Sequence, residues 1–306
     1  IYAIFKKKEF DMVFGTSSRL GTGYLAYKIS KLLNKKLALD IRDIFSDSLS
    51  SLKISKLLIF KPFLKFMVKT ETKICNEADW LNFVSPGFKK YDHLNELKNK
   101  PHVFTNGIDE IFIKNRLKKI KVKNKSKKLI ITYAGNIGYG QGLEKTVVQI
   151  SNYFKNEIIF QLIGDGSSVN LIKDQLEKYK TKNVFIYPPV QRNKLIKYYN
   201  KSDVLFLQLN DFEVFKKVLP SKIFDYGSYD KPILAGVDGE SKKFLSDNFK
   251  YSYIFHPSKY EQAIEKIKEI KKTDLSNINN NEFVKNYDRD KIMNRMTKSL
   301  NEINLW

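Results

Sequence analysis

Short apolar runs alternate with stretches of helical apolar spacing along most of the chain. Residues 11–18 predict a strand that enters a polar turn, 23–34 have helical spacing, and 36–43 predict a second strand. A long segment at 53–78 comes before the next predicted strand, at 79–88, which ends in a turn. Because strands that alternate with helices form parallel sheets, we predict an α/β fold with ligand sites at the carboxyl ends of the strands.

The alternation starts again after a strongly basic stretch. Residues 114–128 contain nine basic side chains and no acidic one, which is typical of a solvated linker between domains. After it, the strands KLIITYAG, IIFQLIGDG, NVFIYPPV and DVLFLQL alternate with helical segments, and an amphipathic helical segment begins near residue 281. The second half therefore predicts a complete α/β domain, whereas the first half lacks its opening strand and helix.

The length of 306 residues favours about two domains, each with its own core. We expect a first Rossmann-like domain at 1–112, a basic linker at 113–128, a second domain at 129–282 and a C-terminal helix at 283–306.

Several protein classes are excluded by composition. Cys75 is the only cysteine, so the chain has no disulfide framework and no cysteine-based zinc site, which fits a reducing compartment. No apolar run is long enough to span a bilayer, and the start has no signal-peptide pattern. The chain opens on Ile1 rather than methionine, as a fragment would.

The formal net charge is +22, and most of the cations are lysine. Abundant Lys, Asn and Ile indicate the compositional bias of an AT-rich genome, with an anionic lipid surface as the next interpretation. We expect no nucleic-acid partner, because we find no patch of arginines interleaved with aromatic residues. We expect no metal, because His93, His102 and His256 have no metal-ligand spacing.

Three strand-to-helix turns in the second half are candidates for phosphate binding. One is the glycine-rich turn at 135–142, the second is IGDGSS at 163–168, and the third is PSK at 220–222. Glycines let backbone amides approach an anion closely. The pattern G-x-x-x-x-G-K-S/T is absent, so this is not an ordinary ATPase loop. We expect the three turns to surround one phosphate-bearing ligand.

The third turn belongs to the stretch VLPSKIFDYGSYDKPILAG at 218–236. Ser221 is expected to cap a short helix, and Gly227 indicates close packing within it. Lys222 and Asp225 share one face of that helix. They could form an exposed ion pair, or they could bind a ligand together.

These motifs resemble a known family. YAGNIGYGQGLE, LIGDGS, YPPV and LPSKIFDYGSYDKPILAGVDGE occur in the order and spacing of the donor domain of retaining glycosyltransferases of family four. FGTSSRLGTGYLAYKISK, LDIRDIFSDS and ADWLNFVSPGF resemble the acceptor domain of bacterial members that build surface polysaccharides. The resemblance implies a GT-B fold, in which two Rossmann-like domains face a cleft and the C-terminal helix returns toward the N-terminal domain, here incomplete.

The resemblance also implies roles for individual residues. Lys222 should bind the donor pyrophosphate and Asp225 the ribose hydroxyls, while Gly138 packs against phosphate or sugar and Val190 lines the base pocket. On the acceptor side, Arg42 and Asp43 should point toward the transferred sugar, and Asn106 should lie at the domain junction. Lys222, Arg42 and Asp43 are thus the predicted catalytic residues. Where the family has paired glutamates, this chain has Lys217 and Asp225, and the family's N-terminal glycine loop is missing with the opening strand.

The implied activity is transfer of a sugar from a nucleotide diphosphate, in particular a uridine diphosphate N-acetylated sugar, to a lipid-linked or saccharide acceptor with retention of configuration. The closest branch acts in O-antigen or capsule assembly. No cofactor or metal is expected besides the nucleotide-sugar substrate. Two alternatives stay open: a nucleotide-sugar 2-epimerase of the same fold, and a non-catalytic sugar-nucleotide-binding subunit.

The segment at 53–73 has lysines at four-residue intervals beside apolar side chains. Such a basic amphipathic helix is suited to lie on an anionic membrane, and an ordinary packed helix with a solvated lysine face is the alternative. We therefore expect a cytoplasmic protein that binds peripherally to the inner face of the cytoplasmic membrane.

Overall fold

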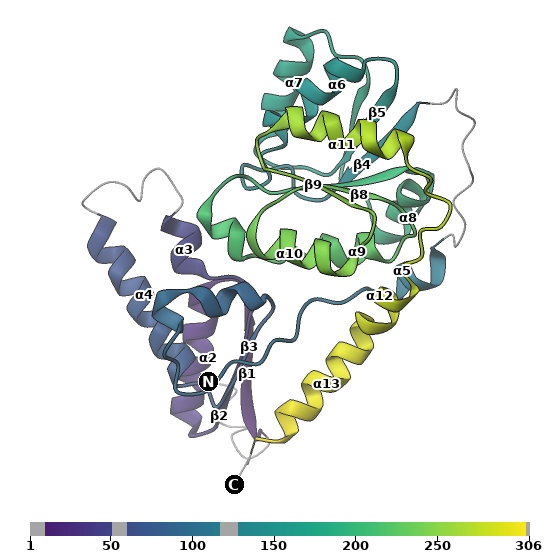
Figure 1. Cartoon of the computed structure of the whole chain (residues 1–306). Coiled ribbons are helices and arrows are strands. Elements are labelled where there is room, and N and C mark those ends of the chain that lie inside the picture. Colours follow the sequence, from purple (N-terminus) through teal and green to yellow (C-terminus); the bar gives the residue numbers. More distant parts are fainter. Residues whose placement is uncertain (1–9, 51–59, 117–127, 304–306) are drawn as a thin grey trace. The chain divides into compact units, whose positions relative to one another are not determined.

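The computed structural model describes residues 10–50, 60–116 and 128–303. It divides into two compact units, of which the first contains 1–106, 212–219 and 290–306 and the second contains 107–211 and 220–289. Each unit contains a parallel sheet with helices packed on it, which confirms the predicted α/β class (Figure 1).

The first unit has a three-stranded sheet in the order β1 (Met12–Ser17), β2 (Lys36–Ile41), β3 (Trp80–Phe83). Its helices are α2 (Leu20–Leu33), α3 (Phe45–Ser50), α4 (Lys61–Asn76) and most of α13 (Arg289–Asn301). Alternate residues of a strand face opposite sides of a sheet. Leu37 and Leu39 accordingly join the core with α2 and α4, whereas Ala38 and Trp80 pack against Met296 of α13.

The second unit has a six-stranded parallel sheet. Its order is β6 (Val184–Tyr187), β5 (Ile158–Ile163), β4 (Leu129–Ala134), β7 (Val204–Gln208), β8 (Ile233–Gly236), β9 (Ser252–Phe255). The chain runs outward from β4 to one edge and then returns to β7 on the other side of β4. Such a reversal creates a crevice at the carboxyl ends of the strands, which is where open α/β sheets bind ligands.

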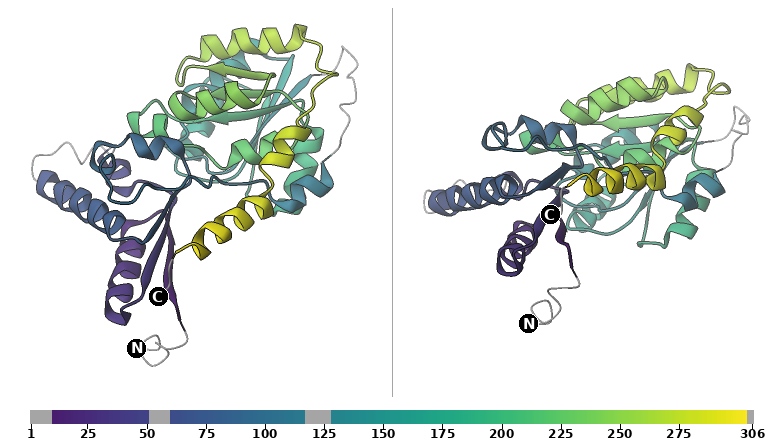
Figure 2. Two further views of the ribbon diagram at one scale, coloured as in Figure 1. Left: turned by 60° about the horizontal axis from the view of Figure 1, so that its bottom comes forward. Right: turned by 90° about the horizontal axis from the view of Figure 1, so that it is seen from below.

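Helices cover both faces of the second sheet (Figures 1 and 2). They are α5 (Glu110–Asn115), α6 (Val147–Phe154), α7 (Val169–Lys178), α8 (Arg192–Lys201), α9 (Lys222–Gly227), α10 (Gly239–Asn248), α11 (Tyr260–Lys272) and α12 (Asn281–Asn286). Side chains of α6, α7 and α11 form the core on one face, and α8, α9 and α10 lie on the other. The close packing predicted at Gly227 is confirmed, because a Cβ there would lie 2.3 Å from Phe283 Cε1.

The unit boundaries differ from the predicted ones at 112, 128 and 282. The second unit begins at Gly107 because the Ile108 N–H donates to Tyr287 O at 2.8 Å and the Arg289 N–H donates to Ile108 O at 3.1 Å. This pairing also interrupts the predicted C-terminal helix, since Tyr287 and Asp288 separate α12 from α13. The pattern of apolar residues alone could not reveal this long-range pairing.

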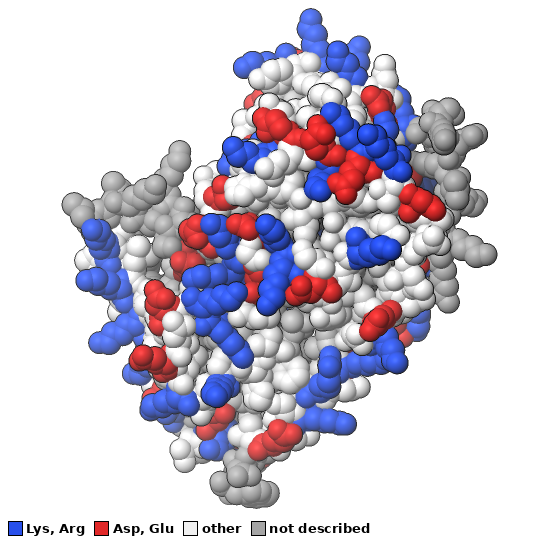
Figure 3. All heavy atoms as spheres, in the orientation of Figure 1, with Lys and Arg blue, Asp and Glu red and all other residues white. Residues whose placement is uncertain are grey.

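Three further predictions are affected by what the structure describes. The predicted linker at 113–128 begins inside α5, and its residues 117–127 lie outside the described part of the chain. The basic segment at 53–73 is described from residue 60, and α4 begins at Lys61. On the face shown in Figure 3, basic side chains are interspersed with acidic ones, so the high net charge does not gather into a single patch there.

Candidate functional site

A pocket of about 450 Å³ lies in the second unit at the carboxyl ends of β4 and β5. It is lined by Ala134, Gly135, Asn136, Ile163, Gly164, Asp165, Pro189, Val190, Leu195, Tyr199, Ser221, Lys222 and Asp225. All three predicted turns therefore contribute to one pocket, and Val190, Lys222 and Asp225 are brought together in it.

The short helix α9 presents Lys222 and Asp225 to this pocket. Ile223, Phe224 and Tyr226 are buried in the core, so the remaining face of α9 carries the two charged residues. Ser221 directly precedes α9, at the cap position that the sequence predicts, but it provides no side-chain cap. A capping residue normally adopts an extended conformation, whereas Ser221 has helical dihedral angles of −58° and −27°. Its side chain accordingly makes no capping hydrogen bond.

Lys222 is a partly buried cation that forms no ion pair with any residue of the described ranges. Its side chain packs on Gly135, where a Cβ would lie 2.4 Å from Lys222 Cε and 2.7 Å from Nζ. The amine lies 5.3 Å from the centre of the Tyr133 ring, and it forms no hydrogen bond or ion pair with any described residue. Burial lowers the pKa of Lys222, and the nearby Asp225 partly opposes this change. A bound anion would relieve this cost of burial.

Burial disfavours the charged form of Asp225, as it does that of Lys222. Burial raises the pKa of Asp225 to about 6, although Arg192, Arg289 and Lys222 all act to lower it. Within the described structure, no hydrogen bond or ion pair joins Asp225 to Lys222, and both side chains are partly buried. The arrangement therefore disagrees with the interpretation of the two residues as an exposed ion pair.

Two arginines near Asp225 were missed in the sequence. Arg192 and Arg289 both form ion pairs with Asp109, and both lower the pKa of Asp225. The rarity of arginine could have pointed to these two residues, because only six of the 55 basic residues are arginines. The six are Arg19, Arg42, Arg116, Arg192, Arg289 and Arg295.

Gly138 is not part of the pocket lining. It is buried, and its N–H donates to Gln141 Oε1 at 3.2 Å. A Cβ at Gly138 would lie 2.8 Å from Asn136 Nδ2, so the glycine makes room for the Asn136 side chain. The structure therefore gives Gly138 contact with Asn136, and its predicted contact with phosphate or sugar stays a prediction.

A sequence model of the family described as "Glycosyl transferases group 1" matches residues 114–290, which is more than half of the chain. The chain belongs to this glycosyltransferase family. No curated protein sequence matches the chain significantly.

Solved structures of glycosyltransferases and related enzymes are similar to this chain over nearly its whole length. HepE of Anabaena, in complex with UDP and glucose, is 12% identical with a TM-score of 0.75, over 98% of this chain and 80% of that chain. Sucrose-phosphate synthase of Thermosynechococcus elongatus is 11% identical with a TM-score of 0.77, over 99% and 76%. The apo lipopolysaccharide outer core galactosyltransferase WaaB is 14% identical with a TM-score of 0.65, over 97% and 78%. The glycosyltransferase thus has the predicted GT-B-like α/β fold.

The predicted acceptor-side residues of this glycosyltransferase lie in the first unit. Arg42 follows β2, its Nη1 lies 3.4 Å from Asp40 Oδ2, and its Nη2 donates to Asn106 Oδ1. The structure thus brings Arg42 and Asn106 together, and Asp43 is the partly buried neighbour of Arg42. These three residues are polar and near the carboxyl end of β2, and their roles in transfer stay predictions.

Lys217, predicted to stand at the position of a family glutamate, has different neighbours from Lys222. Lys217 belongs to the first unit, its carbonyl accepts from Ser85 Oγ at 2.6 Å, and its amine lies 3.7 Å from the centre of the Tyr91 ring. A cation over an aromatic ring is stabilised by the ring's quadrupole. The Lys217 amine therefore lies closer to an aromatic ring than the Lys222 amine, which is 5.3 Å from the Tyr133 ring centre.

The described residues contain neither a metal-binding cluster nor a membrane-spanning helix. No group of three or more His, Cys, Asp or Glu side chains there could hold a metal ion. No helix there is both long and apolar enough to cross a membrane.

Proposed function

We propose that this glycosyltransferase transfers a sugar from a nucleoside diphosphate donor, in particular a uridine diphosphate N-acetylated sugar, to a lipid-linked or saccharide acceptor with retention of configuration. The product would belong to a surface polysaccharide such as an O-antigen, capsule or exopolysaccharide. The observation that carries the proposal is that Lys222, partly buried and in one pocket with Asp225, forms no ion pair within the described part of the chain.

The pocket offers a different chemistry to each part of such a donor. The Lys222 ammonium would bind the diphosphate and stabilise the negative charge that grows on it as the glycosidic bond breaks. The Asp225 carboxylate would accept hydrogen bonds from the ribose hydroxyls. Pro189, Val190 and Leu195 form an apolar wall that suits a planar base.

Two further observations support parts of this assignment. HepE of Anabaena was solved with UDP and with UDP-glucose, which supports a uridine nucleotide. In the first unit, Arg42, Asp43 and Asn106 provide charged and amide groups near the end of β2, and we assign them to the transferred sugar and the acceptor.

Binding of a nucleotide panel tests the donor assignment. Calorimetry with UDP, GDP, CDP and dTDP should give the highest affinity for UDP, and incubation with UDP-N-acetylglucosamine, UDP-glucose and candidate acceptors should release UDP together with a glycosylated product. A tighter complex with GDP would overturn the uridine assignment. Epimerised sugar with free UDP, or binding without turnover, would overturn transfer itself.

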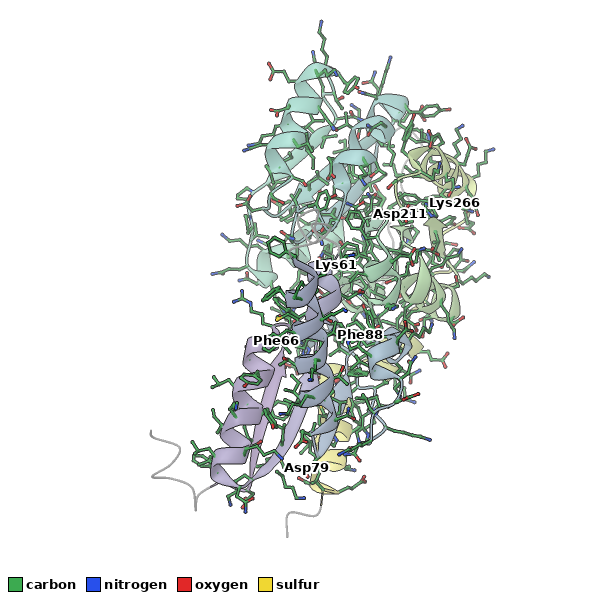
Figure 4. All side chains as sticks on the ribbon, turned by 90° about the vertical axis from the view of Figure 1, so that its left-hand side faces the viewer. Lys61, Phe66, Asp79, Phe88, Asp211 and Lys266 are labelled. Carbon is green, nitrogen blue, oxygen red and sulfur yellow. The ribbon has the colours of Figure 1, made fainter. Side chains whose placement is uncertain are left out.

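We also propose that α4 binds peripherally to the inner face of an anionic membrane, where a lipid-linked acceptor would be found. Phe63 and Phe66 are 49% and 64% exposed on α4, and Lys61, Lys65, Lys69 and Lys73 are exposed on the same helix. Figure 4 shows Lys61 and Phe66 on α4, beside α2. Exposed aromatic rings among lysines suit the boundary between headgroups and acyl chains.

Vesicle flotation tests the membrane proposal. The glycosyltransferase should float with phosphatidylglycerol vesicles and not with phosphatidylcholine vesicles, and Phe63→Ser with Phe66→Ser should abolish flotation. Phe185→Ser, which changes an exposed phenylalanine of the second unit, is the matched control and should float like the parent. Equal flotation with both lipids would overturn the proposal.

A further inference from the structure

The glycine turn at 135–142 offers fewer free backbone amides than its sequence suggests. The N–H groups of Gly135, Ile137, Gly138 and Tyr139 donate to protein acceptors at 2.8, 2.8, 3.2 and 3.3 Å. Among the described residues 135–142, the N–H groups of Asn136, Gly140 and Gly142 have no protein acceptor, and of these three residues only Asn136 lines the pocket. Within the pocket lining, this turn therefore offers an anion one free backbone amide, that of Asn136.

The Asn136 side chain is held in one orientation by its neighbours. Its Nδ2 donates to Gln141 Oε1 at 3.0 Å, and the same oxygen accepts from the Gly138 N–H at 3.2 Å. A side-chain amide nitrogen carries two hydrogens, so one hydrogen of Asn136 Nδ2 is left for another acceptor. The absence of a Cβ at Gly138 leaves the space that this orientation needs.

Asn136 lies next to the residue on which Lys222 packs. Gly135 contacts the Lys222 amine end, and Gly135, Asn136 and Lys222 line the same pocket. The pocket therefore combines an ammonium group without a counterion, a free backbone N–H and a free amide hydrogen. These are three donors that suit an anion with several oxygens.

We propose that Asn136 binds the diphosphate of the donor together with Lys222, and that Gln141 is a positioning residue that holds the Asn136 amide in place. This inference rests on the proposed function, because it concerns the same nucleotide pocket. It adds two residues that the glycine pattern of the turn does not reveal.

A double-mutant cycle tests the two roles, with UDP and uridine as probes in calorimetry at fixed ionic strength. Asn136→Ala should weaken UDP binding about tenfold, because hydrogen bonds to charged groups contribute roughly 1.5–3 kcal/mol. Uridine binding should change less than twofold, since uridine lacks the diphosphate. Gln141→Leu should weaken UDP binding about threefold to fivefold.

The cycle separates positioning from a merely structural role. If Gln141 acts through Asn136, Gln141→Leu should have no further effect on UDP binding in the Asn136→Ala background. Gly138→Ala should behave in the same way, because its Cβ would displace the Asn136 amide. Asn248→Ala, which changes an amide on α10 that is not among the residues lining the pocket, is the control and should bind UDP like the parent.

The outcomes distinguish this inference from the proposed function. Equal losses for UDP and uridine, or additive effects of Asn136→Ala and Gln141→Leu, would overturn the inference. If Lys222→Ala weakens UDP binding and Asn136→Ala does not, the inference fails while the proposed function stands. If the parent binds none of the nucleoside diphosphates, both fail together.

Discussion

The two units differ in whether the charged residues near their strand ends have hydrogen-bond or ion-pair partners among the described residues. In the second unit, Lys222 is partly buried and has no ion pair with a described residue, and burial raises the pKa of Asp225 to about 6. In the first unit, Arg42 contacts Asp40, and the buried Asp40 also accepts from Thr16 Oγ1 at 2.9 Å and from Asn82 Nδ2 at 2.7 Å.

This difference separates two kinds of site. A charge that is buried without a partner costs free energy in the unliganded protein, and a ligand of opposite charge recovers that cost on binding. A charge that already has partners gains little from a new one. We infer that the second unit is prepared for an anionic ligand, whereas Arg42 would have to exchange partners before it could bind one.

The largest predicted effect comes from removing the charge of Lys222, which is compared with removing that of Arg42 in a separate variant. Lys222→Met should weaken UDP binding about ten- to hundredfold and reduce turnover by more, because charge on the leaving diphosphate grows in the transition state. It should not lower the melting temperature, since it removes a poorly solvated charge. Calorimetry, steady-state kinetics and thermal unfolding measure the three quantities.

Arg42→Met is the matched change in the first unit. It should leave UDP affinity within twofold and lower the melting temperature, because Asp40 loses a charged neighbour. The comparison between the units fails if the two variants have the same profile, or if Arg42→Met weakens UDP binding as much as Lys222→Met.

The second prediction concerns the pH dependence of the ribose contact. Asp225 must be ionised to accept two hydroxyl hydrogens, so affinity for UDP-glucose should rise with pH through about 6 and fall below it. UDP-glucose is the better probe, because a terminal phosphate such as that of UDP itself titrates near 6. Asp225→Asn should weaken binding about tenfold at pH 7.5 and flatten this profile.

Stability should change in the opposite direction. A carboxyl whose folded pKa is raised stabilises the protein below its ordinary pKa of 3.8, and this contribution is lost as pH rises to about 6. Without ligand, Asp225→Asn should therefore have a higher melting temperature than the parent at pH 7.5, and its free energy of unfolding should be higher by on the order of 3 kcal/mol. A lower melting temperature would show that Asp225 is stabilised by its neighbours rather than by a ligand.

Much of the second unit follows from local sequence, whereas its electrostatics do not. ILAG at 233–236 is β8 as predicted, and the three glycine or PSK turns meet at one pocket. The ion pairs of Asp109 with Arg192 and Arg289 join residues far apart in the chain, so no local pattern reveals them. The break at Tyr287 has the same cause, since its partner is Ile108.

The third prediction tests whether those ion pairs stabilise the second unit. Asp109→Asn should lower the free energy of unfolding by about 1 kcal/mol, a modest value because both arginine partners are substantially exposed. Glu110→Gln removes the neighbouring exposed pair with Lys114 and should have no measurable effect. Chemical denaturation of both variants decides, and equal stabilities would mean that the Asp109 pairs are as weak as a surface pair.

The smallest predicted effect distinguishes two lysines that are close in sequence and different in surroundings. Lys217 lies over the Tyr91 ring in the first unit, and the sequence predicts that it takes the place of a family glutamate. Lys217→Met keeps the aliphatic stem on the ring and removes only the charge, so it should reduce stability by about 0.5–1 kcal/mol. Its UDP affinity should match that of the parent, in contrast to Lys222→Met, which should lose affinity without losing stability. Chemical denaturation should show a loss of stability for Lys217→Met alone, and calorimetry should show a loss of UDP affinity for Lys222→Met alone. Weaker UDP binding by Lys217→Met, with unchanged stability, would instead assign Lys217 to the donor site.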